Sequence, residues 1–462
     1  MSLSTHHFHP SLLREYDIRG HYEEVLRNED AWAIGQCFSH FLGSKYDKTV
    51  VVCRDGRLSS PVLESFLVQG LQEAGVNVIR IGVGPTPLLY YAIQALQADG
   101  GIMITGSHNP AWYNGFKMTL RDRPVFGHEI RSFQNLTQLI QPSASPGAVK
   151  DVDLIEAYIQ RLLEDYKPKK PLKVVWDAGN GATGEILERL VKKLPGQHTV
   201  LYGTIDGTFP HHHPNPADEY TLRDIKRTLL EQKADLGIAF DGDGDRLGVI
   251  DNQGDIVGPE ALLMLFARDL LKTHFGATII SGVQTSDAVF EDIRAQGGKP
   301  LLCKTGHSLI KQKMKETGAL LAGEMSGHFF FADHYYGFDD ALYAAIRLLN
   351  MVEAFDYSLA LAMIPLPSYA ATPEMRIPCA DDRKFDVVNE IKERLAEIAE
   401  ESFLDVSDLD GVRVRSPKGW WLVRASNTED RLVCRCEARK EEDLPALVDM
   451  LREQLRVSGV RV

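Results

Sequence analysis

The sequence lacks long apolar runs, C-x-x-C cysteine pairs and an excess of positive charge. Its apolar runs, such as residues 262–267, fall well short of the roughly 20 residues that a membrane-spanning helix needs. The six cysteines are scattered and form no C-x-x-C pair, which is typical of a reduced, cytosolic protein. A net charge of −13 argues against nucleic-acid binding, because such binding draws most of its affinity from basic patches.

The first ten residues also lack a secretory signal. They are polar and rich in histidine, and no basic segment followed by an apolar stretch is present. With 462 residues, 44% hydrophobic and 25% charged, the chain has the composition of a soluble globular protein of several domains. Neither the membrane nor nucleic acid is therefore expected as a partner.

One pattern occurs three times along the chain. Each copy begins with a buried strand, at residues 49–53, 173–176 and 278–280, and continues through helical stretches and further strands. Each copy ends in an apolar strand that runs into a polar, glycine-containing loop: GIMITGSHNP (101–110), LGIAFDGDGDR (236–246) and ALLAGEMSGH (319–328). Ligands of α/β domains bind beyond the carboxyl ends of strands, so these three loops are the expected site of chemistry.

Four domains are expected from this pattern and from the segments that separate its copies. The first three, residues 1–152, 153–255 and 256–367, should be topologically similar α/β domains with mixed sheets. Residues 368–462 differ, with two helical stretches around three strands, and should form a smaller α+β domain. The predicted fold class is therefore α/β with a C-terminal α+β domain.

The sequence DGDGDR predicts a metal site. Asp241, Asp243 and Asp245 alternate with glycines, and three carboxylates this close repel one another unless a hard cation lies between them. The loop does not match an EF-hand, because its sixth residue is Arg246 and its twelfth is Asn252. Mg²⁺ is the expected ion, since it keeps coordination positions open for a phosphate oxygen, and Arg246 could donate to that phosphate.

The sequence TGSHNP places Ser107 in an exposed turn at a strand end. A serine that carries a phosphoryl group needs a metal to neutralise that group, and the aspartate loop can supply one. His108 could hydrogen-bond the phosphate or assist proton transfer. Lys117 follows ten residues after Ser107, and cationic neighbours could lower the pKa of its amine so that it exchanges protons with a hydroxyl. A surface lysine is the alternative.

Three further segments carry polar groups suited to a phosphosugar. In GEMSGH, Glu324, Ser326 and His328 alternate and should face the same way on an extended loop, where they suit vicinal hydroxyls. Upstream, KTGHS supplies His307. In VRASNTED, a dense set of donors suits a phosphate dianion, although an Asx-type turn is the alternative; the set comprises Arg424, Ser426, Asn427 and Thr428.

Two weaker candidates complete the set. Tyr16 and Arg19, in EYDIRG, could reach the serine loop or could belong to a simple turn. HHHP, residues 211–214, resembles a cluster of metal ligands, but its polar and proline neighbours favour an exposed loop.

Taken together, these motifs resemble the α-D-phosphohexomutase superfamily, in its bacterial phosphomannomutase/phosphoglucomutase branch. TGSHNP, DGDGDR, GEMSGH and RASNT occur in the family's order, and the resemblance extends from YDIRG to PKGWWLVRASNT. It implies four domains around a central cleft and interconversion of hexose 1-phosphate and 6-phosphate, for mannose or glucose. The reaction would pass through a phosphoserine enzyme and a hexose 1,6-bisphosphate, which would also serve as activator.

The resemblance also implies roles for individual residues. Ser107 would be the phosphoserine, and its phosphate would complete an Mg²⁺ shell with Asp241, Asp243 and Asp245. Proton transfer would fall to Lys117 and His307, with Arg19 and His108 nearby. The phosphosugar would be bound by a larger set: Tyr16, Arg246, Glu324, Ser326, His328, Arg424, Ser426, Asn427 and Thr428.

Within the family, Met325 fits the mannose/glucose branch, and phosphoglucosamine mutase is the leading alternative. Where related enzymes place a lysine, this chain has Gln284, which removes one cation near the phosphosugar. A metal-dependent phosphatase is a second alternative, but it would need a second metal site, for which the sequence offers no clear ligand set. The expected protein is a cytoplasmic monomer that acts on a small phosphosugar and supplies a precursor such as GDP-mannose for polysaccharides.

Overall fold

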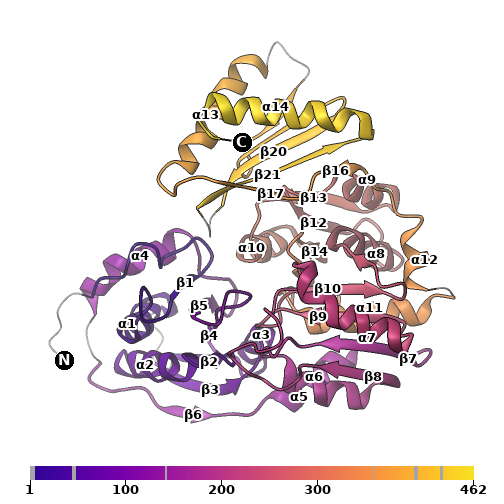
Figure 1. The fold of residues 1–462 in the computed structure, drawn as a ribbon. Helices are drawn as coiled ribbons and strands as arrows, with labels where there is room; N and C mark the ends of the chain where they lie inside the picture. Colours follow the sequence, from indigo (N-terminus) through magenta and orange to yellow (C-terminus); the bar gives the residue numbers. More distant parts are fainter. Residues whose placement is uncertain are drawn as a thin grey trace. The chain divides into compact units, whose positions relative to one another are not determined.

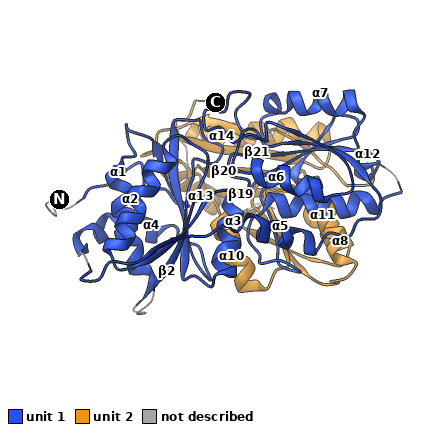
Figure 2. Ribbon diagram, turned by 90° about the horizontal axis from the view of Figure 1, so that it is seen from below, with its two compact units in different colours: residues 1–262, 326–364 blue, residues 263–325, 365–462 orange. Residues whose placement is uncertain are grey.

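A computed structural model of the chain describes residues 6–43, 48–140, 143–356, 358–399, 404–426 and 430–461 (Figure 1). The chain divides into two compact units (Figure 2). The first unit comprises residues 1–262 and 326–364, and the second comprises residues 263–325 and 365–462. Among the described residues, no helix combines the length and apolar character that crossing a membrane requires.

The first sheet has six strands in the order β1-β5-β4-β2-β3-β6. Its central strand β2 is rich in valine and has an almost fully buried core, as expected for a strand covered on both faces. The strands are β1 Ile18–His21, β2 Thr49–Arg54, β3 Asn77–Val83, β4 Gly100–Ile104, β5 Tyr113–Leu120 and β6 Val149–Asp151. The helices are α1 Asn28–Phe38, α2 Ser60–Glu73, α3 Thr86–Ala95 and α4 His128–Leu136.

The second sheet repeats this plan with five strands in the order β11-β10-β9-β7-β8. Here β7 lies between β8 and β9 and pairs in parallel with both, whereas β10 pairs antiparallel with β9. The strands are β7 Leu172–Asp177, β8 Gly196–Leu201, β9 Leu236–Phe240, β10 Leu247–Asp251 and β11 Ile256–Val257. The helices are α5 Ile155–Glu164, α6 Gly184–Leu190 and α7 Arg223–Gln232.

A third copy begins at β12, which pairs in parallel with β13 and β14. The strands of this part of the chain are β12 Thr278–Gly282, β13 Lys299–Cys303, β14 Leu321–Gly323 and β15 Phe329–Phe331. The helices are α8 Pro259–Leu271, α9 Asp287–Ala295, α10 His307–Thr317, α11 Ala341–Ala354 and α12 Leu359–Met363.

The last part of the chain is an antiparallel sheet with the order β16-β21-β20-β19-β18 and with β17 paired to β21. Helices α13 and α14 cover one face of this sheet (Figure 1), and the apolar core between them includes Trp421, Cys434 and Cys436. The strands are β16 Ala370–Ala371, β17 Met375–Pro378, β18 Asp405–Ser407, β19 Val412–Ser416, β20 Gly419–Ala425 and β21 Arg431–Ala438. The helices are α13 Lys384–Ala399 and α14 Leu444–Val457.

The same strand order therefore recurs three times, as β4-β2-β3, β9-β7-β8 and β14-β12-β13. The three glycine-containing loops leave the ends of β4, β9 and β14, which are the corresponding strands of the three copies. This confirms the predicted fold class, with three topologically similar α/β parts followed by a smaller α+β part.

Within the first unit, a buried carboxylate joins α5 to the start of α11. Asp340 caps α11 by accepting from the Tyr343 amide at 2.9 Å. The Tyr158 and Tyr335 hydroxyls also donate to Asp340, at 2.7 and 2.8 Å. Burial raises the pKa of Asp340 to about 6, and the donated hydrogen bonds limit that rise by stabilising the ionised form.

We expect Tyr158→Phe to lower the free energy of unfolding by about 1.5–3 kcal/mol, because it removes one of the donors to a buried charge. Urea unfolding followed by circular dichroism would measure the loss. Tyr220→Phe is the matched control, because Tyr220 is 63% exposed. Equal midpoints for the two variants would show that the Tyr158 hydroxyl contributes nothing to stability.

Candidate functional site

Ser107 lies in the loop that follows β4, and its side chain faces the loop that follows β9. Its hydroxyl donates to Asp241 Oδ2 at 2.9 Å and lies 3.2 Å from His108 Nδ1. The residue is only 2% exposed and has a φ of +49°, in the left-handed region that few non-glycine residues adopt. The expected exposed turn is thus a buried and strained one, a combination common at functional sites.

The three aspartates of the second loop are fully buried. Asp241 Oδ1 accepts from the amides of Asp245 and Arg246, both at 3.1 Å, and these bonds curl the loop around its first carboxylate. Gly244, with a φ of +73°, makes the curl possible. Burial and repulsion from Asp243 and Asp245 raise the pKa of Asp241 well above its usual range. The loop therefore concentrates negative charge where water cannot screen it.

These residues fit a divalent cation. Each of Asp241, Asp243 and Asp245 offers a carboxylate oxygen, and the three oxygens lie within 4.8 Å of one another. Asp243 Oδ1 is buried and accepts no hydrogen bond from any described residue. A buried carboxylate oxygen without a partner is costly, and a hard cation would supply one. The acidic triad could thus hold a metal ion.

Lys117, on β5, lies against the same triad. Its Nζ is 2.6 Å from Asp243 Oδ2 and also pairs with Asp245. Burial alone would lower the pKa of Lys117, but the two carboxylates outweigh that effect and raise the pKa above its ordinary value. The expectation of a depressed pKa is therefore wrong for this arrangement, because the nearest charges are anions rather than cations.

Other polar residues surround the Ser107 loop. Arg19, on β1, donates to Asn109 Oδ1 at 2.6 Å and to Gly106 O at 3.4 Å. Burial, together with Arg246 and Arg19, lowers the pKa of His108 well below its usual range, so its imidazole is neutral. The Nε of Arg246 is buried without a hydrogen-bond partner in the described part of the chain. Tyr16 is half-buried, two residues before β1.

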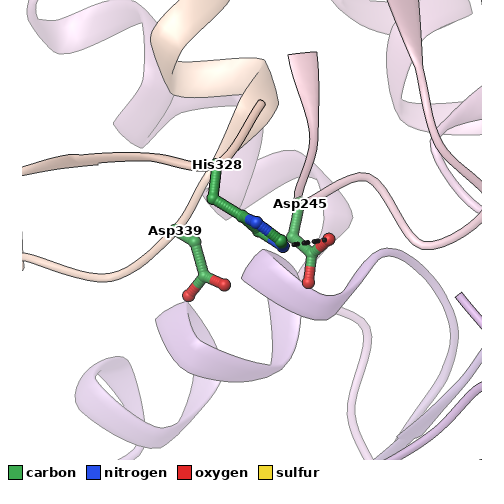
Figure 3. A group of neighbouring side chains, drawn as sticks. All are labelled: Asp245, His328 and Asp339. Carbon is green, nitrogen blue, oxygen red and sulfur yellow. Dashed lines mark ion pairs between the residues drawn. The ribbon is translucent and has the colours of Figure 1, made fainter. Parts of the chain in front are cut away.

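His328 extends the aspartate cluster. Its Nδ1 lies 2.8 Å from the Ser326 hydroxyl, and its Nε2 lies 3.3 Å from Asp245 Oδ1. Figure 3 shows the His328 ring between Asp245 and Asp339, and these three buried residues form a second group whose ligand atoms lie within 4.8 Å. The sequence offered no clear second ligand set, so this group is a correction. Because both His328 nitrogens already have neighbours, the histidine is better placed to orient Asp245 than to bind a second metal.

Other candidate residues lie in the second unit. Glu324 is buried and accepts from the Gly306 amide at 2.8 Å. That bond lies at the start of α10, whose first residue is the half-buried His307. Glu324 of GEMSGH is thus tied to the turn that carries His307, an arrangement that the separation of the two residues in sequence does not predict.

Arg424 is buried at the end of β20, where its Nε donates to Asp410 Oδ2 at 3.0 Å. The same carboxylate oxygen accepts from the Thr305 amide at 3.0 Å. Ser426 is also buried, and its amide donates to Arg431 O at 2.9 Å. Asn427 and Thr428 lie outside the described residues.

Gln284 is 7% exposed, and its Nε2 donates to Glu374 Oε2 at 2.7 Å. The guanidinium of Arg435 donates to the main-chain oxygen of Gln284 at 2.6 Å. A cation therefore lies beside position 284 even though its side chain is neutral.

The loop at residues 211–214 is less exposed than predicted: His211 is exposed, His212 and His213 are half-buried, and Pro214 is buried. His212 Nε2 lies 3.0 Å from Asp177 Oδ2, so its ring has a carboxylate partner. Neither metal-ligand group found among the described residues includes a histidine of this loop.

Two residues near Ser107 were missed by the sequence analysis, namely Asp55 and Arg57. They follow β2 in the segment RDGR and are buried against the Ser107 loop. The available signal was a charged pair directly after an apolar strand.

Comparison with known proteins assigns all four parts of the chain to one family. Models described as phosphoglucomutase/phosphomannomutase α/β/α domains I, II and III match residues 10–132, 156–254 and 258–364. The model of the C-terminal domain of the same family matches residues 374–454.

Individual relatives match over nearly the full length. A phosphomannomutase/phosphoglucomutase of Pseudomonas aeruginosa is 43% identical over 446 residues, covering 96% of each chain. A phosphoglucomutase of Neisseria gonorrhoeae is 38% identical over 450 residues, also covering 96% of each chain. A crystal structure of a phosphoglucomutase/phosphomannomutase family protein from Burkholderia thailandensis superposes with a TM-score of 0.91 at 39% identity, covering 98% of this chain and 99% of the other. The chain therefore belongs to the phosphoglucomutase/phosphomannomutase family of the α-D-phosphohexomutase superfamily.

Proposed function

We propose that the protein interconverts hexose 1-phosphate and hexose 6-phosphate, for mannose, glucose or both, through a phosphoserine at Ser107. The observation that carries this proposal is the 2.9 Å hydrogen bond between the Ser107 hydroxyl and Asp241, in a buried cluster of three carboxylates that fits a divalent cation. Family membership and the names of the relatives support the same reaction.

The proposed reaction has two transfers. In the first, the bond between phosphorus and Ser107 Oγ breaks, a bond forms to the free hydroxyl of the hexose monophosphate, and that hydroxyl loses its proton. The resulting hexose 1,6-bisphosphate reorients so that its other phosphate faces Ser107. The bond between that phosphorus and the sugar oxygen then breaks, a bond to Ser107 Oγ forms, Ser107 Oγ loses its proton and the released sugar oxygen gains one. Hexose 1,6-bisphosphate, supplied from solution, would phosphorylate an enzyme molecule that has lost its phosphate. It is thus the expected activator.

Mg²⁺ is the proposed metal, held by Asp241, Asp243, Asp245 and the phosphate on Ser107, where it would neutralise charge on the transferring group. In the return transfer Ser107 Oγ must lose its proton, and the acceptors within reach are Asp241 Oδ2, at 2.9 Å, and His108 Nδ1, at 3.2 Å. Lys117 is charged in this arrangement and suits stabilisation of phosphate better than removal of a proton.

Recognition of the sugar and of the non-reacting phosphate is proposed for the remaining candidate residues. Glu324 and Ser326 would bind sugar hydroxyls, with His328 nearby, and His307 would assist proton transfer. Tyr16, Arg19 and Arg246 would contribute on the side of the serine loop. The non-reacting phosphate would be held by Arg424, Ser426, Asn427 and Thr428. The proposed ligand is a small phosphosugar. The proposed enzyme is a cytoplasmic monomer whose product serves as a precursor, for example of GDP-mannose.

We expect Ser107→Ala to abolish phosphorylation of the enzyme and nearly all mutase activity, because no acceptor for the phosphoryl group remains. ³¹P NMR of mannose 1-phosphate with Mg²⁺ and a trace of glucose 1,6-bisphosphate would follow the 6-phosphate signal. Ser145→Ala, at an exposed site, is the matched control. Release of inorganic phosphate would favour a phosphatase, and activity confined to glucosamine phosphates would favour a phosphoglucosamine mutase.

Chelation of divalent metal with EDTA should stop turnover, and Mg²⁺ should restore it. Mg²⁺ should also raise the melting temperature of the wild type, because a ligand at 100 times its Kd stabilises the folded state by about 2.7 kcal/mol. Asp243→Asn should remove most of that shift, whereas Asp255→Asn, at an exposed site in the same part of the chain, should retain it. An unchanged Mg²⁺ shift in Asp243→Asn would place the ion elsewhere.

Arg424→Ala should raise KM for the phosphosugar roughly 10–100-fold, corresponding to loss of a charged hydrogen bond worth about 1.5–3 kcal/mol, while Ser107 stays phosphorylated. Steady-state kinetics and intact-mass measurement of the phosphoprotein would test both parts. Arg456→Ala, on the exposed face of α14, is the control. Loss of phosphorylation in Arg424→Ala would assign this arginine to the fold or to the donor step instead.

A further inference from the structure

A buried ion pair lies directly under the Ser107 loop and belongs to none of the expected motifs. Arg57 and Asp55 sit in the turn after β2, with side chains 0% and 3% exposed, and Arg57 Nε is 3.0 Å from Asp55 Oδ2. Asp55 Oδ1 accepts from the Arg57 amide at 3.0 Å and from the Ser60 hydroxyl at 2.6 Å. These bonds fix the carboxylate, and the carboxylate in turn fixes the plane of the guanidinium.

The remaining donors of Arg57 all point to main-chain oxygens of the Ser107 loop and its exit. Its Nη2 donates to Ser107 O at 2.8 Å and to Asn109 O at 2.7 Å. Its Nη1 donates to Tyr113 O at 2.9 Å and also to Pro110 O. One side chain thus satisfies four main-chain carbonyl groups on both sides of the His108 position, that of the buried Ser107 and those of three half-buried residues.

Asp55 secures the other end of the same turn. Its Oδ2 accepts from the Gly106 amide at 3.1 Å, immediately before Ser107. The Gly106 amide and the Ser107 carbonyl, which lie on either side of the Ser107 Cα, are therefore held by the two members of one ion pair. This matters because Ser107 has a φ of +49°, a strained conformation that persists only where its surroundings over-determine it.

The fit around Arg57 leaves no spare room. A Cβ placed on Gly106 would lie 2.4 Å from Arg57 Cζ and 2.7 Å from Tyr113 O. Lysine could not replace the arginine, because it presents one ammonium point rather than a planar fork of five donors. The guanidinium shape, rather than the charge alone, is what the four carbonyls require.

We infer that Arg57, aligned by Asp55, is a positioning residue that holds the Ser107 loop in the geometry from which Ser107 gives up and regains its phosphoryl group. The inference rests on the proposed function and names a determinant of its donor step. The sugar must be accepted in two orientations, so the donor has to stay fixed while the substrate turns. A clamp made of main-chain bonds under the loop can do this without touching the substrate.

The test compares Arg57→Lys and Gly106→Ala with the wild type and with Arg54→Lys. Arg54 is the matched control, since it lies on the same segment and pairs with Glu64 at 3.1 Å, away from the Ser107 loop. Three kinds of measurement would be made. Steady-state kinetics would give kcat and KM for mannose 1-phosphate, and intact mass would give the fraction of chains phosphorylated at Ser107 in excess glucose 1,6-bisphosphate. Amide hydrogen exchange would be followed across residues 104–113 without substrate.

Arg57→Lys and Gly106→Ala should lower kcat by roughly 100-fold, the scale of a small misplacement of a reacting group, with KM unchanged. They should also reduce phosphorylation of Ser107 and speed exchange in residues 104–113, whereas Arg54→Lys should do neither. Wild-type kcat in folded Arg57→Lys would overturn the inference, as would a loss of kcat fully explained by the unfolded fraction.

The outcomes separate this inference from the proposed function. If the wild type itself neither acquires phosphate on Ser107 nor converts the sugar, the proposed function fails. Faster exchange in residues 104–113 of Arg57→Lys would then still support the clamp, because that readout needs no turnover. If the wild type is active and both variants match it, only the clamp fails.

Discussion

Three buried carboxylates beside one hydroxyl are the constraint on which the rest of the first unit depends. Asp241, Asp243 and Asp245 come from one short loop, so the chain cannot separate them to relieve their repulsion. Relief has to come from other elements, which explains why Lys117 and His328 converge on this loop. A divalent cation and a phosphate on Ser107 would complete the balance of charge.

The repeated topology explains how residues far apart in sequence meet at these loops. In each copy the first strand lies between the second and the third, and the third strand also ends at an inner position of the sheet. Loops that leave such a position are flanked by further strands and turns, which can bury and brace them. β4 and β9 both follow this rule, and their loops meet through the bond from Ser107 to Asp241.

Much of this arrangement could be predicted from sequence because strand patterns and glycine-bearing polar loops are local signals. The apolar strands before residues 105 and 241 predicted that Ser107 and the three aspartates of DGDGDR would lie in loops at strand ends. What could not be predicted depends on distant partners. The pKa of Lys117 was expected to fall, but carboxylates more than 120 residues away raise it. Arg57 was missed because its hydrogen-bond partners are main-chain carbonyls. Every residue has such a carbonyl, so the amino-acid sequence does not show which ones an arginine will bind.

Distant partners also change the expected effect of Gln284 on local charge. The family resemblance implied a lysine at this position, so Gln284 was expected to leave one positive charge fewer near the phosphosugar. In the structure the Gln284 side chain donates to Glu374, which also pairs with Arg376 at 2.8 Å. A lysine directed along the same path would have had its charge largely neutralised by Glu374. Arg435, bound to the main chain of Gln284, keeps a cation at this point, so the substitution alters local pairing more than local charge.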